Sequence, residues 1–276
     1  MMKITKAIIP VAGWGTRRLP ITKTIEKCML PIGNRPIVDY VVHDCIKAGI
    51  TDIYFVISEQ STQLRDYYRS NIDLNDYLRR NNKEDLLPLI VPPKVKFHYI
   101  IQSSYGKYGT AIPVGLVVPL LDNNESAVVL MGDDCIYRRD DESEIARLIA
   151  AAGDECSMLG VKIPQNEVSK YGVIKTNNRG DFVSIVEKPS PDKAPSNMIN
   201  VSKYVFNKKA LKMIEQYSKK NKSSGEYYIT DPINDYVVKG GKLKVVPAEG
   251  EYLDSGTVEG WLKANQIVIN DMKMEK

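Results

Sequence analysis

Cysteine is scarce in this 276-residue chain, which contains four of them. They are far apart in the sequence, at Cys28, Cys45, Cys135 and Cys156. Because no C-x-x-C spacing occurs, we expect neither a zinc site nor a redox-active pair. Scattered cysteines of this kind are typical of proteins in a reducing compartment.

Long hydrophobic runs are also missing. The longest apolar stretch, residues 111–121, is too short to span a bilayer and is interrupted by Pro113 and Pro119. Residues 1–17 contain neither the hydrophobic core nor the cleavage pattern of a signal peptide. We therefore expect a cytoplasmic protein that has no membrane partner.

A dense basic surface is absent as well. The formal net charge is +4 and the isoelectric point is about 8.6, which is only mildly basic. Outside the loop described below, the one compact basic cluster is Lys219, Lys220 and Lys222, which precedes a Ser-Ser-Gly turn. A nucleic-acid interface needs a denser basic face, so we expect no nucleic-acid partner.

The chain does contain a regular alternation of short apolar and amphipathic segments. Strands are expected at residues 6–12, 52–57, 95–101 and 126–131, with helices at residues 37–48, 110–120 and 142–152. This order predicts an α/β fold with a Rossmann-like, mixed but mostly parallel sheet, flanking helices and right-handed crossovers. After residue 155 the expected strands are shorter, which adds a small β/α part that ends in an amphipathic helix at 258–273.

One polar insertion, residues 60–92, interrupts this alternation. The sequence predicts that it is helical, and it is longer than a usual connection. We therefore interpret it as a lid or as an interface element.

The most informative stretch is VAGWGTRRLPITKTIEKCMLP, residues 11–31. It follows an expected buried strand, so the backbone N–H groups of residues 13–16 come to the carboxyl edge of the sheet, where α/β folds bind ligands. Arg17 adds a bidentate phosphate donor and Lys27 a mobile charge. A dinucleotide fingerprint is excluded because Arg18 replaces its third glycine, and a P-loop is excluded because Gly-Lys-Ser/Thr is missing.

This stretch resembles the signature of the sugar-1-phosphate nucleotidyltransferase family, G-x-G-T-R-x-x-P-x-T-(x)-K-x-M-L-P. The resemblance extends over nearly the whole chain, through the segments NRPIVDYVVHDCIKAGITDI, QSSYGKYGTA, EKPSPDKAPSN and YLDSGTVEGW. Within the family, the TKTIEKCMLP loop and the long YYRSNIDLNDYLRRN insertion are most similar to bacterial UTP:glucose-1-phosphate uridylyltransferases.

The resemblance implies a single nucleotidyltransferase domain over residues 1–276. About 1–155 would form a nucleotide-binding half, and about 156–276 a sugar-phosphate-binding half with the C-terminal helix. It implies transfer of a uridylyl group from UTP to glucose 1-phosphate, giving UDP-glucose and pyrophosphate, with Mg²⁺ as cofactor in a homodimer or homotetramer. Two alternatives stay open: thymidylyl or cytidylyl transfer to a hexose 1-phosphate, and a catalytically silent homologue that binds sugar nucleotides.

The same resemblance assigns roles to individual residues. Arg17 and Lys27 are expected to stabilise the triphosphate and the leaving pyrophosphate, and Lys188 to hold the sugar phosphate. Glu226 is expected either at the sugar or as a cap of the following helix. The nucleotide base and phosphates are expected to contact Ala12, Gly13, Gly15, Thr16, Gln102 and Gly109. The sugar is expected to contact Gly172 and Glu187.

Two aspartates are the expected metal ligands. The resemblance places Asp133 of GDD and Asp254 of LDSG at Mg²⁺, and two carboxylates suffice because this ion also takes phosphates and water. Asp134 is the less suitable alternative to Asp133. The attacking group implied by the resemblance is a phosphate oxygen of the sugar phosphate, which is ionised near neutral pH because the second phosphate pKa is about 6. No general base is then needed, so His43 and His98 are expected to be structural.

A few positions depart from the uridylyltransferase pattern. Thr110 replaces a usual histidine, and Cys28 replaces a common glutamate. Asn200 and Ser202 stand where the family often has a small residue and glycine. Ser202 is expected near the sugar. These departures therefore affect the prediction of which sugar is bound more than any other prediction.

Overall fold

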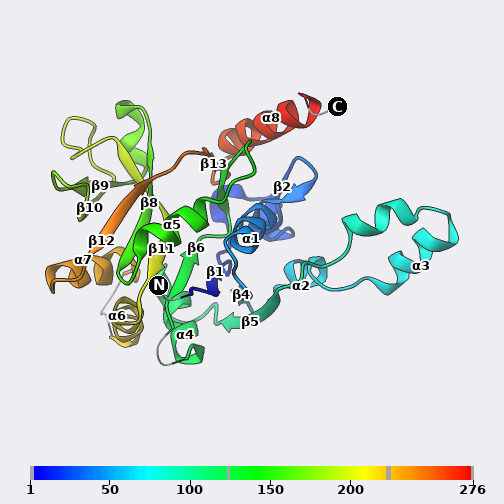
Figure 1. Cartoon of the computed structure of the whole chain (residues 1–276), viewed down its shortest axis with the longest axis horizontal. Helices are drawn as coiled ribbons and strands as arrows, with labels where there is room; N and C mark the ends of the chain where they lie inside the picture. The colour runs from blue at the N-terminus through cyan, green and yellow to red at the C-terminus, as the bar shows by residue number, and fades with distance from the viewer. Residues whose placement is uncertain (1–2, 123–124, 222–224, 275–276) are drawn as a thin grey trace.

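The architecture is a mixed β-sheet with helices on both faces (Figure 1). The computed structural model describes residues 3–122, 125–221 and 225–274. Within these ranges nine strands form the main sheet: β1 (Lys6–Pro10), β4 (Asp52–Ser58), β5 (Lys96–Gln102), β6 (Ala127–Leu130), β8 (Cys156–Lys162), β9 (Gly172–Thr176), β10 (Phe182–Glu187), β11 (Met198–Phe206) and β12 (Leu243–Pro247). Seven of them follow the order β10-β9-β11-β6-β1-β4-β5, while β8 pairs with β11 and β12 pairs with β8.

The helices and the smaller strand pairs complete the fold. Two short ribbons join β2 (Pro31–Ile32) to β3 (Arg35–Pro36) and β7 (Asp134–Tyr137) to β13 (Glu251–Asp254). The α-helices of the described ranges are α1 (Ile37–Lys47), α2 (Gln63–Tyr67), α3 (Ile72–Arg80), α4 (Ala111–Val117), α5 (Glu144–Ala152), α6 (Lys208–Lys219), α7 (Thr230–Val238) and α8 (Val258–Met274). Among them, no helix is both long and apolar enough to cross a membrane.

The central strands are parallel, as predicted. Strand β1 lies between β4 and β6 and is parallel to both, and β4 is parallel to β5. Neighbouring residues of β1 are buried in two different cores: Ile8 packs with α4 and α6, and Ile9 packs with α1. Burial on both faces explains the unbroken apolar sequence of this strand. The antiparallel pairing of β11 with β6 makes the sheet mixed.

Several elements begin or end at residues that differ from those expected, as the helix expected at 110–120 does, which spans Ala111–Val117. The first strand stops at Pro10 rather than at residue 12, because the chain turns there into the glycine-rich loop. Helix α7 begins at Thr230, so the preceding residues are not helical. The N–H of Tyr227 instead donates to the carbonyl of Tyr108 at 3.0 Å, and its carbonyl accepts from the N–H of Ala111 at 2.9 Å. Lys222 and the two serines of the expected basic turn lie outside the described residues.

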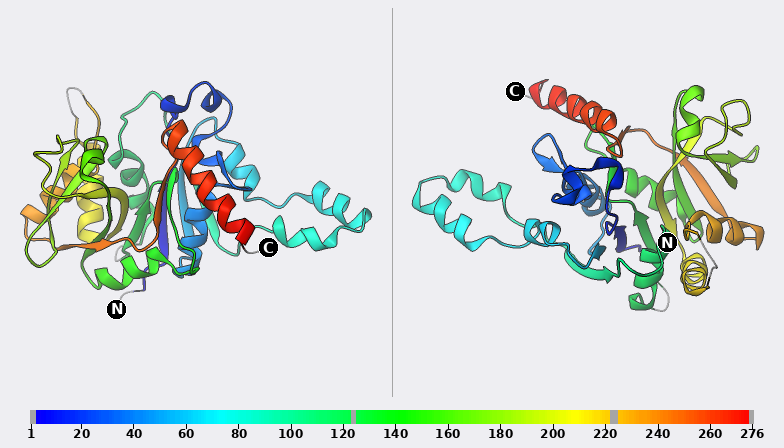
Figure 2. Two further views of the ribbon diagram at one scale, coloured as in Figure 1. Left: turned by 90° about the horizontal axis from the view of Figure 1, so that it is seen from above. Right: turned by 180° about the vertical axis from the view of Figure 1, so that it is seen from behind.

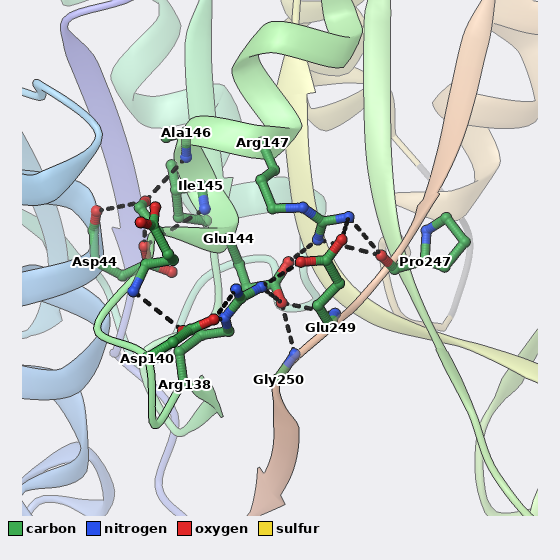
Figure 3. Close-up of polar contacts among 12 residues, drawn as sticks. Asp44, Arg138, Asp140, Glu144, Ile145, Ala146, Arg147, Pro247, Glu249 and Gly250 are labelled. Carbon is green, nitrogen blue, oxygen red and sulfur yellow. Dashed lines mark hydrogen bonds and ion pairs between the residues drawn. The ribbon is translucent and has the colours of Figure 1, made fainter.

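A buried carboxylate connects α5 to the segment that enters β13 (Figure 3). Glu144 is fully buried, and its Oε1 accepts hydrogen bonds from the N–H groups of Glu249 and Gly250, both at 2.7 Å. Arg138 and Arg147 form ion pairs with the same carboxylate. This network fixes the start of β13, and β13 carries Asp254 at its other end.

The insertion at 60–92 forms an arm that projects from the body of the molecule (Figures 1 and 2). Helices α2 and α3 and a 3₁₀ helix at Glu84–Leu89 confirm that it is largely helical. Large apolar side chains on the arm are exposed, Ile72 by 72% and Leu89 by 77%. The arm contributes no residue to the cavity described below.

Candidate active site

A cavity of about 470 Å³ lies beyond the carboxyl end of β1. Its lining combines the glycine-rich loop, the segment after β5, the segment after β6 and a residue that precedes α7. This is the edge of a parallel sheet at which ligand binding is expected. The expected site residues that line it are Ala12, Gly13, Gly15, Thr16, Lys27, Gln102, Gly109, Asp133 and Glu226.

The glycine-rich loop has one residue in the left-handed region. Gly15 has φ of +63°, a conformation that glycine adopts without a steric cost. The hydroxyl of Thr22 donates to the carbonyl of Gly15 at 2.9 Å, which holds this turn. Trp14 lines the cavity and is 60% exposed.

The two adjacent arginines of this loop point in different directions. Arg17 is exposed in the 3₁₀ turn Thr16–Arg18, so its guanidinium is accessible to a phosphate. Arg18 is only 4% exposed, and its Nη1 donates to the carbonyls of Ser255 and Thr257, both at 2.8 Å. Only Arg17 of this pair is available as a substrate ligand.

Lys27 and Asp133 form an ion pair beside the cavity. The lysine is the expected phosphate group, and the aspartate is the expected metal ligand. In the structure each charge balances the other, since the ammonium of Lys27 occupies a cation position beside the carboxylate. A triphosphate with its bound cation would supply new partners to both.

Asp133 and Asp254 come together through the pairing of β7 with β13. In this ribbon Asp254 lies opposite Asp134, the neighbour of Asp133. The hydroxyl of Ser255 donates to the carbonyl of Asp133 at 2.6 Å, and the hydroxyl of Tyr171 donates to Oδ2 of Asp254 at 2.9 Å. The ribbon therefore brings together two expected metal ligands that are more than a hundred positions apart in the sequence.

Asp134 has a different environment from Asp133. Its side chain is only 13% exposed, forms an ion pair with Lys203, and accepts a hydrogen bond from the hydroxyl of Tyr252 at 3.0 Å. Burial raises the pKa of Asp134, while the nearby charge of Lys203 acts in the opposite direction. Its oxygens already have protein partners, so its environment favours Asp133 as the ligand that faces the cavity.

The two expected metal ligands suit a hard cation that also binds phosphates and water. Within the described ranges no cluster of three or more His, Cys, Asp or Glu side chains could hold a metal ion. Asp133 and Asp254 supply carboxylate oxygens alone, which is the donor type that Mg²⁺ takes together with phosphates and water.

The expected base side of the cavity is connected to the segment before α7. Gly109 has φ of +119°, and a Cβ at this position would lie 2.4 Å from the N of Tyr227, so a side chain cannot be accommodated. The hydroxyl of Thr110 accepts a hydrogen bond from the N–H of Ile229 at 2.9 Å. Thr110, which departs from the family pattern, thus joins the loop after β5 to the segment that carries Glu226.

The expected sugar side lies at the β9–β10 hairpin. Gly172 pairs directly with Glu187 across the hairpin, and the N–H of Lys188 donates to the carbonyl of Tyr171 at 3.0 Å. Burial raises the pKa of Glu187; Lys188 opposes this shift, and the carboxylate of Glu226 adds to it. Gly172, Glu187, Lys188, Arg17 and Asp254 do not line the 470 Å³ cavity.

Asn200 compensates for the missing glycine at Ser202. Ser202 has φ of +50°, which explains a preference for glycine at this position. The side-chain oxygen of Asn200 accepts a hydrogen bond from the N–H of Ser202 at 3.0 Å. The two departures therefore belong to the same turn of β11.

A family model described as Nucleotidyl transferase matches residues 6–271. The matched region contains the glycine-rich loop, both aspartates and Lys188. The chain belongs to the nucleotidyl transferase family.

Individual relatives resemble this nucleotidyl transferase over nearly its whole length. A UTP–glucose-1-phosphate uridylyltransferase of Pseudomonas aeruginosa is 31% identical over 277 residues, which covers 98% of this chain and 97% of the relative. A UTP-bound UGPase from Acinetobacter baumannii has a TM-score of 0.84 at 27% identity and covers 96% and 93% of the two chains. A UDP-glucose pyrophosphorylase complexed with UDP-glucose has a TM-score of 0.81 at 28% identity, with 97% and 99% covered. The predicted family and fold are confirmed.

Both histidines of this nucleotidyl transferase lie outside the cavity lining. His98 contacts Asp52 at 3.0 Å and stacks on Tyr54, and His43 lies 3.5 Å from Asp39. Burial opposes ionisation of Asp52, but hydrogen bonds from His98, Lys6 and Thr51 lower its pKa to about 2.

The four cysteines of this nucleotidyl transferase are buried and unpaired. Cys28 lines the cavity, and burial raises the pKa of its thiol well above the usual value. This thiol therefore stays neutral beside the glycine-rich loop.

Sequence reasoning missed several residues that hold the site of this nucleotidyl transferase together. Arg18, Ser255, Tyr171 and Lys203 each contact an expected site residue or its neighbour. Tyr171 precedes Gly172 and Ser255 follows Asp254, so adjacency to an expected site residue was the one available signal. Lys203 had no such signal, since its partner is known only from the pairing of distant strands.

Proposed function

We propose that this chain transfers a uridylyl group from UTP to glucose 1-phosphate and releases UDP-glucose and pyrophosphate. The observation that carries the proposal is the cavity in which the glycine-rich loop and Lys27 face Asp133 at the carboxyl edge of the sheet. The P. aeruginosa relative is named for this activity, and the two solved relatives are described with UTP and with UDP-glucose.

The reaction requires charge neutralisation rather than a general base. An oxygen of glucose 1-phosphate attacks the α-phosphorus of UTP, a P–O bond forms, and the bond to pyrophosphate breaks. The attacking oxygen is already ionised near neutral pH because the second phosphate pKa is about 6. The main barrier is the approach of two anions, so positioning and electrostatic stabilisation are expected to dominate.

The chain's own residues divide this work. Backbone N–H groups of the glycine-rich loop bind the nucleotide, and the exposed Arg17 and the mobile Lys27 hold the triphosphate and the leaving pyrophosphate. Lys188 holds the sugar phosphate at the hairpin, while Glu187 accepts hydrogen bonds from sugar hydroxyls. Gln102 and the backbone of Ala12 and Gly13 read the uracil edge.

We propose Mg²⁺ as the cofactor, held by Asp133 and Asp254. When bound, this ion would neutralise phosphate charge in the ground state and in the transition state. Lys27, now paired with Asp133, would transfer to the phosphates.

Pyrophosphate release tests the substrate assignment. We would assay UTP, dTTP, CTP and ATP against glucose, galactose and N-acetylglucosamine 1-phosphates in the presence of Mg²⁺. The expected maximum is UTP with glucose 1-phosphate. The base alone should give only a modest preference over dTTP, since uracil and thymine differ by one methyl group, which changes binding by about 1–3 kcal/mol. A maximum elsewhere would keep the chemistry and change the substrate, whereas no release with UDP-glucose still bound would support the silent homologue.

We also propose that the arm mediates assembly into a homodimer or homotetramer. Residues 63–90 contain five basic and five acidic side chains, so the arm is electrically balanced around its exposed apolar residues. A two-fold interface joins a surface to its own copy and therefore needs such self-complementarity. Apolar area of this kind is typical of protein–protein contacts.

Charged substitutions on the arm are expected to reduce the oligomeric mass. Ile72→Glu combined with Leu89→Glu would bury unpaired carboxylates in the interface. Light scattering coupled to gel filtration would measure the change. The matched control is Val238→Glu, because Val238 is an equally exposed apolar residue, at 86%, on α7. An unchanged mass in the arm variant would contradict this role.

A further inference from the structure

Arg18 forms a direct bridge between the glycine-rich loop and the segment after Asp254. Its side chain is buried, and one nitrogen, Nη1, donates to both the Ser255 and Thr257 carbonyls at 2.8 Å. The guanidinium carbon also lies 5.2 Å from the ring centre of Trp261 on α8. The bridged residues are 237 and 239 positions apart.

Ser255 extends the bridge to Asp133. It is fully buried, its carbonyl accepts from Arg18, and its hydroxyl donates to the carbonyl of Asp133 at 2.6 Å. It also follows Asp254 directly. Two side chains therefore connect the loop that would hold the triphosphate to both carboxylates that would hold the cation.

We propose that Arg18 is a positioning residue that, through Ser255, fixes the glycine-rich loop relative to Asp133 and Asp254. This inference rests on the proposed nucleotidyl transfer at the same site. Arg18 does not line the cavity, and its buried guanidinium is directed toward backbone carbonyls, so it does not act as a phosphate ligand. That role belongs to its exposed neighbour Arg17.

The bridge predicts which step depends on Arg18. UTP alone is proposed to contact only the loop and the base-reading segment, so its metal-free binding does not depend on the separation between the loop and residues 254–257. A reactive complex also needs the phosphates and the metal ligands at a set separation, and a displacement of about 1 Å can cost roughly 10²-fold in rate. Loss of Arg18 should therefore reduce kcat and the response to Mg²⁺ more than the affinity for free UTP.

Four variants separate this role from the alternatives. Arg18→Met removes the guanidinium and keeps its volume, and Ser255→Ala removes only the hydroxyl that contacts Asp133. Arg17→Met removes the proposed phosphate ligand. Arg179→Met is the neutral control, since Arg179 is exposed on the β9–β10 turn.

Four measurements are compared across the variants. For Arg18→Met we expect kcat about 10- to 100-fold lower, a higher Mg²⁺ concentration for half-maximal activity, and unchanged calorimetric affinity for UTP without metal. Hydrogen exchange of the ligand-free protein should become faster in both 13–18 and 255–260. Ser255→Ala should show the same pattern more weakly. Arg17→Met should instead weaken metal-free UTP binding and leave exchange in 255–260 unchanged.

Several results would overturn the proposal. If Arg18→Met weakens metal-free UTP binding as Arg17→Met does, Arg18 is a nucleotide ligand. If exchange in 255–260 and the Mg²⁺ response both match wild type, the two segments are not coupled. If Arg18→Met does not fold, Ser255→Ala decides by the same criteria. The binding and exchange experiments need no turnover, so a substrate survey without activity would contradict the proposed function and still leave Arg18 testable.

Discussion

Asp133→Asn is expected to lower kcat/KM for nucleotidyl transfer by at least about 10²- to 10³-fold, in a protein that remains folded. The substitution keeps the shape of the side chain and removes one negative charge from the proposed metal site. It also leaves Lys27 without its partner. Because this pair is partly exposed, its loss should cost about 1 kcal/mol of stability or less.

Steady-state kinetics, a melting curve and a Mg²⁺ titration would be measured together. Asp141→Asn is the matched control, since Asp141 also forms an ion pair with a lysine, Lys47, but lies away from the cavity. Asp254→Asn should resemble Asp133→Asn. Activity of Asp133→Asn close to that of wild type would remove Asp133 from the metal site.

Lys203→Met is expected to have the largest effect on stability, a loss of about 3–5 kcal/mol. Lys203 is 3% exposed and forms its ion pair with Asp134, whose side chain is 13% exposed. Without the lysine, the carboxylate keeps only the hydroxyl of Tyr252 as a side-chain donor among the described contacts. An unpaired buried charge is far more costly than the pair is beneficial. The melting temperature should fall by roughly 10 °C.

The pH dependence of this loss has a definite sign. Burial already raises the pKa of Asp134, and Lys203 acts against that shift, so removing the lysine should raise the pKa further. When folding raises the pKa of a carboxyl group, the folded protein becomes less stable as the pH increases above the pKa of that group in the unfolded chain, which is about 3.9. The deficit of Lys203→Met should therefore be largest near neutral pH and smaller toward pH 4.

A second substitution checks the cause. Lys203→Met combined with Asp134→Asn removes both charges and should recover much of the lost stability in denaturant titrations. Lys244→Met serves as the control at an exposed strand lysine. If the double variant is no more stable than Lys203→Met, the buried charge is not the origin of the loss.

The sequence predicted those parts of the fold that depend on local pattern. Residues 7–9 of β1 and the run after Asp52 are apolar because both faces of the sheet are covered, and this burial identifies central parallel strands. The glycine-rich loop was recognisable because Gly15 needs a left-handed backbone that few residues adopt. Its position at the carboxyl edge then followed from the order of the elements.

Other features depend on contacts that no local pattern records. Arg17 and Arg18 are identical in type and adjacent, yet a 3₁₀ turn directs one to solvent and the other to the segment after Asp254. Tyr171 and Lys203 act on residues 83 and 69 positions away. The insertion at 60–92 was expected to be helical, but its projection away from the cavity depends on how it leaves the sheet.

The two tryptophans of the chain, Trp14 and Trp261, provide optical probes of the two sides of the site. Trp14 is exposed in the cavity wall, so its fluorescence should respond when a nucleotide base excludes water from the indole. Trp261 contacts Arg18, and its indole N–H donates to the carbonyl of Pro31 at 2.7 Å. Its emission should report the junction of the loop with α8. Replacing either one by phenylalanine would leave a single tryptophan. The two resulting proteins would allow occupation of the loop and ordering of the proposed metal-binding segment to be timed separately.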